Sequence, residues 1–245
     1  MGACSAQADE LQELPIGTFE FPPYNYTENG MVTGAGTEIF TEVLRRMGYR
    51  AKITRYPWKR TQAMAERGEI AGMFTFTSNP QRAAVNHITE PLGVIYDVFF
   101  KRRADAIHWE KIDDLKGHII GATDGYNYAP VFLNPLKSGE LKVDLIASQH
   151  PELVHLKKLA AGHIDLAICE ISLCGHIIRK STPQFDAIDY IDHKIGPIRT
   201  FHAGFSKKWP GSKELHARFN EELGQFAREG GRKKIHQKYH LTEID

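Results

Sequence analysis

Residues 51–76 read AKITRYPWKRTQAMAERGEIAGMFTF, and this stretch decides the fold class. The segment Ala51–Tyr56 alternates apolar and polar side chains, which predicts a strand. Pro57 is favourable in the first turn of a helix and Gly68 is a typical helix end, so we expect a helix between them. The apolar run Ala71–Phe76 predicts a second strand. Strand, helix and strand in this order indicate an α/β fold with a mainly parallel sheet covered by helices.

The pattern continues on both sides of this stretch. A strand at Leu14–Thr18 and a helix at Thr37–Met47 precede it, and one long strand is expected at Gly93–Lys101. The pattern then restarts as a second unit of similar size. Its expected strands are Ile119–Ala122, Val143–Ile146, Asp165–Glu170 and Ile188–Ile191, and its expected helices follow Gly125, span Pro151–Ala161 and end at Lys180. No low-complexity linker separates the units, so we expect two closely packed lobes with a cleft between them.

The composition limits the class of partner. The chain has 245 residues, with 31 Lys and Arg against 30 Asp and Glu, which gives a net charge of +1. A nucleic-acid-binding protein usually has a basic excess, so we expect no nucleic-acid partner. The longest apolar run, Gly93–Phe100, is interrupted by Asp97 and is far shorter than the roughly 20 residues of a membrane span.

The first residues indicate where the protein acts. Residues 1–8 read MGACSAQA and contain an A-x-A pattern at residues 6–8, the small-residue site that a signal peptidase cleaves. We interpret residues 1–8 as the remnant of a signal peptide and expect the protein to reach the periplasm. As an alternative, Cys4 is a lipid-anchored cysteine, since residues 2–4 are similar to the end of a lipobox. A third interpretation is an N-terminus without ordered structure.

Two further cysteines lie five residues apart, at Cys169 and Cys174. They could pair in an oxidising periplasm, but two free buried thiols are the simpler interpretation and the one we predict. The sequence has no C-x-x-C or H-x-x-x-H spacing, so we expect no metal site. Gly34-Ala35-Gly36 lacks the third glycine of a dinucleotide fingerprint, and we expect no cofactor.

Ligands of open α/β sheets bind beyond the carboxyl ends of the strands, so side chains that follow strands are candidate site residues. In the first unit, aromatic side chains could form the walls of a pocket, and an arginine beside hydroxyl groups could hold an anion. The candidates there are Glu20, Tyr24, Trp58, Arg60, Thr75, Thr77 and Arg82. The alternative is a packed surface loop over residues 20–31, a core tryptophan and a solvated arginine.

In the second unit, Tyr126 and Asn127 lie where a strand gives way to a helix, and the backbone N–H groups of that helix would face the cleft. Glu170 ends another strand. A carboxylate at that position could hold an ammonium group or act as an acid or base, and the alternative is that it only begins the next helix. The charged segment Ser212–Tyr239 is expected to be helical, with its charges in solvent.

In this order, these residues resemble the bacterial extracellular solute-binding proteins of family 3, which are type II periplasmic binding proteins. The resemblance runs from about Leu14 to Tyr239. It rests on the Pro22-Pro23-Tyr24 loop, Trp58 with Gly68, Thr77 to Arg82, the Leu115-Lys116-Gly117 turn and Gly162-x-x-Asp165. It implies two α/β lobes, each with a mixed sheet flanked by helices and joined by two hinge crossings near Lys101 and Thr200. Lobe 1 would hold residues 9–101 plus 202–245, and lobe 2 residues 102–201.

The resemblance also implies roles. Arg82 would grip the α-carboxylate of a ligand beside Thr77, with Tyr24 and Trp58 as aromatic walls. Glu170 falls where the family usually has an aspartate that holds the α-amino group. The protein would then be a monomeric, non-enzymatic receptor that delivers an amino acid or similar small carboxylate to an inner-membrane ABC-type permease. Two alternatives remain: a dehydratase-like enzyme on the same fold with Glu170 as general acid, or a soluble ligand carrier for a chemoreceptor or sensor.

Overall fold

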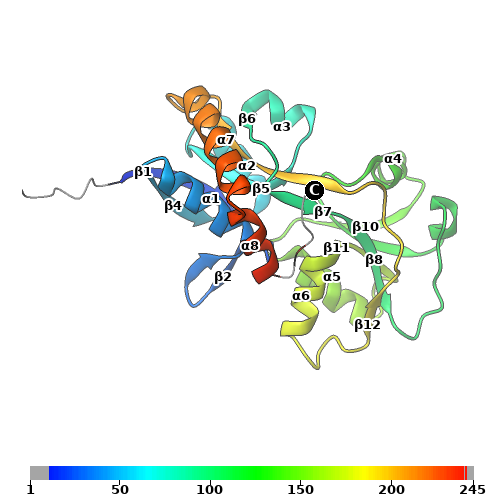
Figure 1. Cartoon of the computed structure of the whole chain (residues 1–245). Coiled ribbons are helices and arrows are strands. Elements are labelled where there is room, and N and C mark those ends of the chain that lie inside the picture. The colour runs from blue at the N-terminus through cyan, green and yellow to red at the C-terminus, as the bar shows by residue number, and fades with distance from the viewer. Residues whose placement is uncertain (1–10, 240, 242–245) are drawn as a thin grey trace, which may run out of the picture.

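The computed structural model describes residues 11–239 and residue 241. Two β-sheets, each flanked by helices, form two lobes that lie side by side (Figure 1). Among the described residues, none of the helices combines the length and the apolar character needed to cross a membrane.

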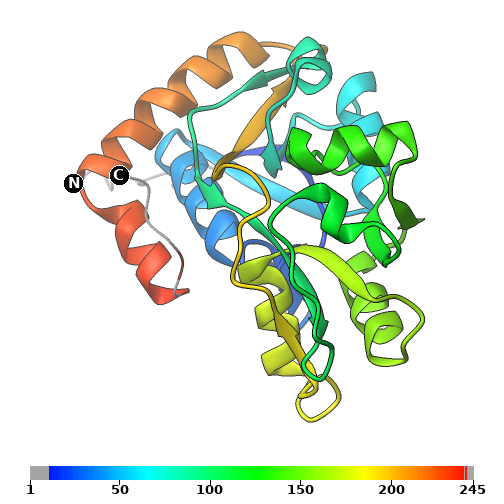
Figure 2. The same cartoon turned by 90° about the vertical axis from the view of Figure 1, so that its right-hand side faces the viewer.

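The first lobe is built on a six-stranded mixed sheet in the order β4-β1-β5-β13-β6, with β7 also paired to β13. Its strands are β1 (Gln12–Thr18), β4 (Tyr49–Arg55), β5 (Gly72–Thr77), β6 (Asn86–Ile88), β7 (Gly93–Ile95) and β13 (Arg199–Ser206). Its helices are α1 (Ala35–Arg46), α2 (Trp58–Arg67), α3 (Pro80–Val85), α7 (Ser212–Arg228) and α8 (Gly231–Lys238). The helices α7 and α8 pack beside α1 (Figure 2).

The stretch that decides the fold class has the predicted structure. The strand β1 pairs in parallel with both β4 and β5, and α2 connects the last two. The helix ends at Gly68, whose φ of 76° is readily accessible only to glycine. Behind the sheet, Phe40 of α1 stacks on Phe74 of β5 with ring centroids 4.8 Å apart, and Phe219 of α7 packs on Phe40. These buried rings fix α1 and α7 against the sheet.

The second lobe has a five-stranded mixed sheet in the order β10-β9-β11-β8-β12. Its strands are β8 (Asp97–Arg102), β9 (Ile119–Thr123), β10 (Lys142–Ile146), β11 (Leu166–Glu170) and β12 (Ile188–Tyr190). Its helical segments are η1 (Ile112–Leu115), α4 (Pro130–Ser138), α5 (Pro151–Ala160) and α6 (Ile171–Lys180). The strands β9, β10 and β11 are parallel, so their carboxyl ends meet at one edge, which faces the first lobe.

The chain changes sheets earlier than predicted. The strand β7 pairs with β13 in the first sheet, whereas β8 begins after Tyr96 and pairs with β11 in the second sheet. The single strand predicted at Gly93–Lys101 is therefore two strands in different sheets. Residues 97–101 were expected in the first lobe, but they lie in the second sheet. The return crossing lies between β12 and β13, so residues 199–201 belong to the first sheet. A continuous apolar run hides such a change, because the segment is buried in both sheets.

Several other strands were missed, among them β6. The predicted loop at residues 20–31 contains part of a small hairpin of β2 (Tyr26–Glu28) and β3 (Met31–Thr33). The strand β13, with the sequence RTFHAGFS, was not predicted at all. In the first sheet it lies between β5 and β6. Its apolar residues Phe201, Ala203 and Phe205 alternate with less apolar ones, so the signal for a strand was present in the sequence.

Candidate ligand-binding site

A cavity of about 60 Å³ lies between the lobes. Since one enclosed water needs about 10–15 Å³ on this measure, the space holds roughly four to six waters, or a small solute rather than a polymer. Side chains of both lobes line it. The apolar walls are formed by Phe19, Phe21, Trp58, Phe76, Ile168 and Phe201.

Arg82 is the most deeply placed cation of the cavity wall in the first lobe, with 5% of its surface exposed. Its Nη1 donates to the carbonyl oxygen of Thr77 at 2.6 Å and to the Thr77 hydroxyl at 3.0 Å, and its Nη2 donates to the Gly125 carbonyl oxygen at 3.1 Å. Its Nε–H has no partner among the described residues. Burial lowers the pKa of Arg82 to about 10, so the group stays charged at neutral pH. Two of its five donors thus remain for a ligand, the number that a carboxylate takes.

Local structure holds this arginine in place. Asn79 caps α3 through its side-chain oxygen, which accepts the Arg82 backbone N–H at 2.8 Å, and Pro80 occupies the first turn. Within the preceding strand β5, Thr75 has a φ of 64°, a conformation that a β-branched residue adopts only when its surroundings enforce it. The Thr75 hydroxyl is buried without a partner among the described residues. Strained residues of this kind are concentrated at ligand sites.

Glu170 provides a carboxyl group from the second lobe. It is 4% exposed at the end of β11, where its Oε2 accepts the Leu173 backbone N–H at 2.8 Å. The Tyr24 hydroxyl donates to its Oε1 at 3.4 Å. Burial raises the pKa of Glu170 to about 8. Glu170 begins α6, as one interpretation of the sequence expected, and it also lines the cavity. That it holds an ammonium group stays a prediction.

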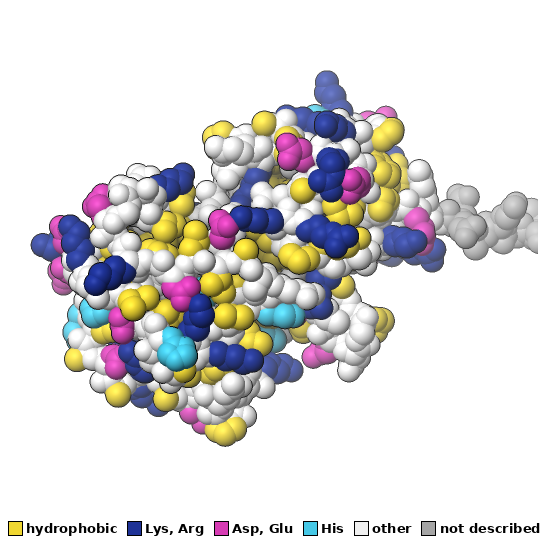
Figure 3. Space-filling model, turned by 180° about the vertical axis from the view of Figure 1, so that it is seen from behind, with side chains coloured by type: hydrophobic (Ala, Val, Ile, Leu, Met, Phe, Trp, Pro, Cys, Tyr) yellow, Lys and Arg dark blue, Asp and Glu magenta, His cyan; other side chains and the backbone are white. Residues whose placement is uncertain are grey.

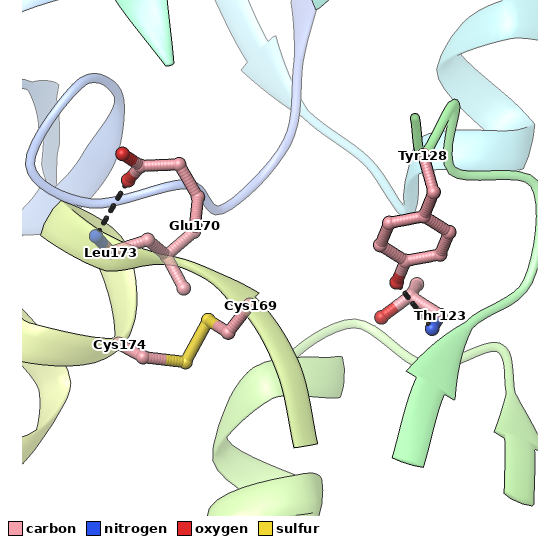
Figure 4. The surroundings of a disulfide bond; sticks show 6 residues. All are labelled: Thr123, Tyr128, Cys169, Glu170, Leu173 and Cys174. Carbon is pink, nitrogen blue, oxygen red and sulfur yellow. Dashed lines mark hydrogen bonds between the residues drawn. A yellow bond between two sulfur atoms is a disulfide. The ribbon is translucent and has the colours of Figure 1, made fainter. Parts of the chain in front are cut away.

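Cys169 and Cys174 form a disulfide, which corrects the prediction of two free thiols (Figure 4). The first turn of α6 follows β11 directly and brings Cys174 back over the strand end, with the two Cα atoms 6.2 Å apart. The sequence spacing alone does not reveal this return. The bond closes a ring that contains Glu170 and the backbone N–H of Leu173, so it fixes the strand end to the helix that Glu170 caps.

Replacing both cysteines by serine is expected to lower the free energy of unfolding by about 2 kcal/mol, because the unfolded chain regains the entropy of an open loop. For a chain of this size the midpoint of thermal unfolding should fall by roughly 4–8 °C. Reducing the wild-type protein should give the same shift, and thiol titration should confirm the reduction. A reduced wild-type protein with an unchanged midpoint would contradict this prediction.

The structure adds an ion pair that the sequence analysis missed. Arg199, at the start of β13, donates from Nη2 to Asp97 Oδ2 and from Nη1 to the Asn127 carbonyl oxygen. Burial raises the pKa of Asp97, and the Arg199 guanidinium opposes that rise. Asp97 was noticed only as an interruption of an apolar run, which was the available signal for it. Arg199 gave no signal, because β13 was not predicted.

Glu152 is the third carboxyl group of the cavity wall and was also missed. It lies in the first turn of α5, is 7% exposed and is hydrogen-bonded to the Tyr126 side chain. Burial raises its pKa to about 7. An acidic residue in the first turn of a helix is common for reasons of helix stability alone, so the sequence does not distinguish this one.

Contacts between the lobes close the cavity. The Trp58 indole N–H donates to the Gly125 carbonyl oxygen at 3.2 Å, so this oxygen accepts hydrogen bonds from both Trp58 and Arg82. The Asn127 amide donates to the Thr77 hydroxyl at 3.2 Å. Outside the cavity, Lys59 of the first lobe forms an ion pair with Asp124 of the second. The structure is therefore a closed arrangement of the two lobes.

The sequence family "bacterial extracellular solute-binding proteins, family 3" matches residues 14–242 of this chain. The chain belongs to this family. A curated relative of this solute-binding protein is the probable amino-acid-binding protein YxeM of Bacillus subtilis (strain 168). It is 24% identical, and the match covers 98% of this chain and 88% of YxeM.

Solved structures confirm the predicted fold, a two-lobed type II periplasmic binding protein. A histidine kinase sensor domain with similarity to periplasmic binding proteins superposes with a TM-score of 0.82, at 20% identity and covering 96% of this chain and 100% of that one. The arginine-, lysine-, histidine-binding protein ArtJ of Geobacillus stearothermophilus superposes with a TM-score of 0.80, at 16% identity, covering 96% and 97%.

Most of the predicted site residues of this solute-binding protein meet at one place. The cavity is lined by Trp58, Thr75, Thr77, Arg82, Tyr126, Asn127 and Glu170. The other three are not lining residues. Tyr24 lies behind Glu170 instead of forming a wall, Glu20 forms an ion pair with Arg55, and the exposed Arg60 lies over the Tyr56 ring at 5.0 Å. Whether the lining residues bind a solute stays a prediction.

Glu170 and Glu152, whose pKa values are strongly raised, make the stability of the ligand-free protein depend on pH. An unfolded glutamate has a pKa near 4.3, whereas Glu170 and Glu152 have folded values of about 8 and about 7. At these two groups the folded state binds more protons between these values, so their contribution to the free energy of unfolding should fall as the pH rises from about 5 to 8. The lowered pKa of buried His155 works in the opposite direction below about 6.5. Urea unfolding at several pH values measures this slope. The difference in stability between wild type and Glu170→Gln should shift in favour of the variant as the pH rises from about 5 to 8, because the variant lacks the Glu170 contribution. Parallel profiles of variant and wild type would refute the assignment.

Proposed function

We propose that this protein is a periplasmic receptor that carries an α-amino acid or similar small carboxylate to an inner-membrane ABC-type permease. The observation that carries the proposal is that Arg82 and Glu170 both line the wall of one closed cavity. Arg82 keeps donors for a carboxylate, and Glu170 offers a carboxyl group to an ammonium. A zwitterion satisfies both groups at once, which a simple anion or cation does not.

Closure of the lobes would supply the affinity. Arg82 belongs to the first lobe and Glu170 to the second, so a ligand held by both favours the closed arrangement over an open one. Water excluded on closure strengthens each charged hydrogen bond inside the cavity. No residue of the site is assigned a catalytic role in this proposal, because closure around a solute requires none.

Several further observations support the location and the partners. The family is described as extracellular, and the Cys169–Cys174 disulfide is typical of an oxidising compartment. Residues 1–8, which we interpret as a signal-peptide remnant, lie outside the described residues. On the face seen in Figure 3, Lys and Arg side chains alternate with Asp and Glu over both lobes. This mixed surface speaks against a nucleic-acid partner on that face.

A second candidate function is ligand carriage for a sensor. It is favoured by the high structural similarity to a histidine kinase sensor domain. The cavity would bind the same solute in either case, and only the partner of the closed form would differ. Recovery of a permease with the ligand-loaded protein, and not with the ligand-free protein, would support transport; recovery of a receptor would support sensing.

Ligand binding can be tested first by thermal unfolding. The protein should be unfolded, dialysed and refolded to remove any bound solute, then screened with α-amino acids, dicarboxylates, polyamines and sugars. An α-amino acid at about 100 times its Kd should stabilise the fold by about 2.7 kcal/mol, or roughly 5–11 °C. Stabilisation only by solutes that lack a carboxylate would refute the assignment of Arg82 and Glu170.

A further inference from the structure

The cavity wall has more acidic than basic side chains. Two guanidinium groups, of Arg82 and Arg199, face three carboxyl groups, of Asp97, Glu152 and Glu170. Asp97 and Arg199 neutralise each other through their ion pair. This leaves one cation, Arg82, and two acids. A zwitterion matches Arg82 and Glu170, and Glu152 then has no positive partner.

Glu152 is not neutralised by the protein. The described residues include no lysine, arginine or histidine in an ion pair with it, and its side-chain partner is the Tyr126 hydroxyl. Glu20, another acid near it, is already paired with Arg55. A buried carboxylate that lacks a cation is costly to maintain, so its presence on a cavity wall requires a reason.

The surroundings of Glu152 show what could approach it. Tyr126, whose side chain bonds to Glu152, also lines the cavity, together with the rings of Phe19 and Trp58. Phe19 and Trp58 are in contact, with ring centroids 4.8 Å apart. These rings offer an apolar surface for a short chain of methylene groups, which can carry a charged end to a distant carboxylate.

We propose that the ligand has a second positive charge and that Glu152 receives it, so that the solute is an α-amino acid with a cationic side chain. This inference rests on the proposed function, in which Arg82 and Glu170 hold the carboxylate and the α-ammonium. Glu152 is then the residue that determines specificity. A neutral side chain would leave the Glu152 carboxyl group without a cation in the closed lobes, whereas an ammonium or guanidinium group would complete the charge balance.

The test compares two ligands of the same carbon chain by calorimetry on the refolded protein. L-Lysine and L-norleucine differ only in the terminal ammonium group. We expect wild-type protein to bind L-lysine at least about 30-fold more tightly, as for other buried charge pairs. The variant Glu152→Gln should lose most of this preference and should bind L-norleucine within about threefold of wild type. Glu140→Gln, which changes an exposed acid after α4, is the matched control and should keep the preference.

The outcomes separate the two proposals. If L-norleucine binds wild type as tightly as L-lysine, Glu152 does not receive a cation and this inference is wrong, while the proposed amino-acid receptor stands. If neither amino acid binds, and the wider set of α-amino acids also fails, the proposed function is wrong and the inference falls with it. Because the ligand comparison uses the wild-type chain, it decides the question even if Glu152→Gln does not fold.

Discussion

Replacing Arg82 by methionine is expected to weaken binding of the α-amino acid by about 30-fold to several thousand-fold, the usual cost of breaking a buried charge-assisted pair. The ligand carboxylate would enter the closed cavity without the cation that compensates for its lost hydration. Methionine keeps much of the volume beside Trp58, so the loss reports charge and hydrogen bonding rather than an empty space. Calorimetric titration of the refolded variant measures the change in Kd.

Two controls make this result specific. Arg103→Met removes an exposed arginine whose side chain is 68% accessible, and it should leave Kd within about twofold. Arg82→Lys keeps the charge but loses the planar fork, so its affinity should lie between those of wild type and Arg82→Met. If Arg82→Met folds and binds the amino acid with unchanged Kd, Arg82 is not the carboxylate anchor.

The sequence was informative where local rules decide the structure. A proline at a helix start and a glycine at its end gave α2, and the flanking apolar runs gave β4 and β5. Because parallel strands place their carboxyl ends at one edge, the residues after those strands could be expected to meet. Thr77 and Arg82 from the first lobe and Asn127 and Glu170 from the second do lie around one cavity.

The remaining features depend on contacts between distant segments. Nothing local distinguishes Tyr24, which is buried behind Glu170, from an aromatic residue that lines a pocket. Likewise Glu152 has the sequence context of an ordinary first-turn acid. Asp97 and Arg199 are 102 residues apart, and their pairing exists only because β8 and β13 both begin at the crossings between the lobes.

This Asp97–Arg199 pair is the site of the largest expected loss of stability. Changing Asp97 to alanine should lower the free energy of unfolding by about 3–5 kcal/mol, because Arg199 would keep its charge in a buried place without a carboxylate. The Asp97 side chain is 5% accessible and that of Arg199 is 16%, so solvent screens the remaining charge only weakly. The thermal midpoint should fall by roughly 6–20 °C.

Removing the charges of both Asp97 and Arg199 distinguishes the cost of an unpaired charge from the cost of lost packing. In the double variant Asp97→Leu with Arg199→Met no buried charge is left over, so most of the stability lost in Asp97→Ala should return. The pair also joins the first residues of β8 and β13, and Arg199 bonds to the Asn127 carbonyl oxygen of the other lobe. The double variant should therefore fold well but close less firmly, with weaker ligand binding than wild type.

Urea unfolding measures the stabilities of these variants, and calorimetric titration measures their affinities for the ligand. If the double variant is as unstable as Asp97→Ala, packing at the crossing and not the unpaired Arg199 charge causes the loss.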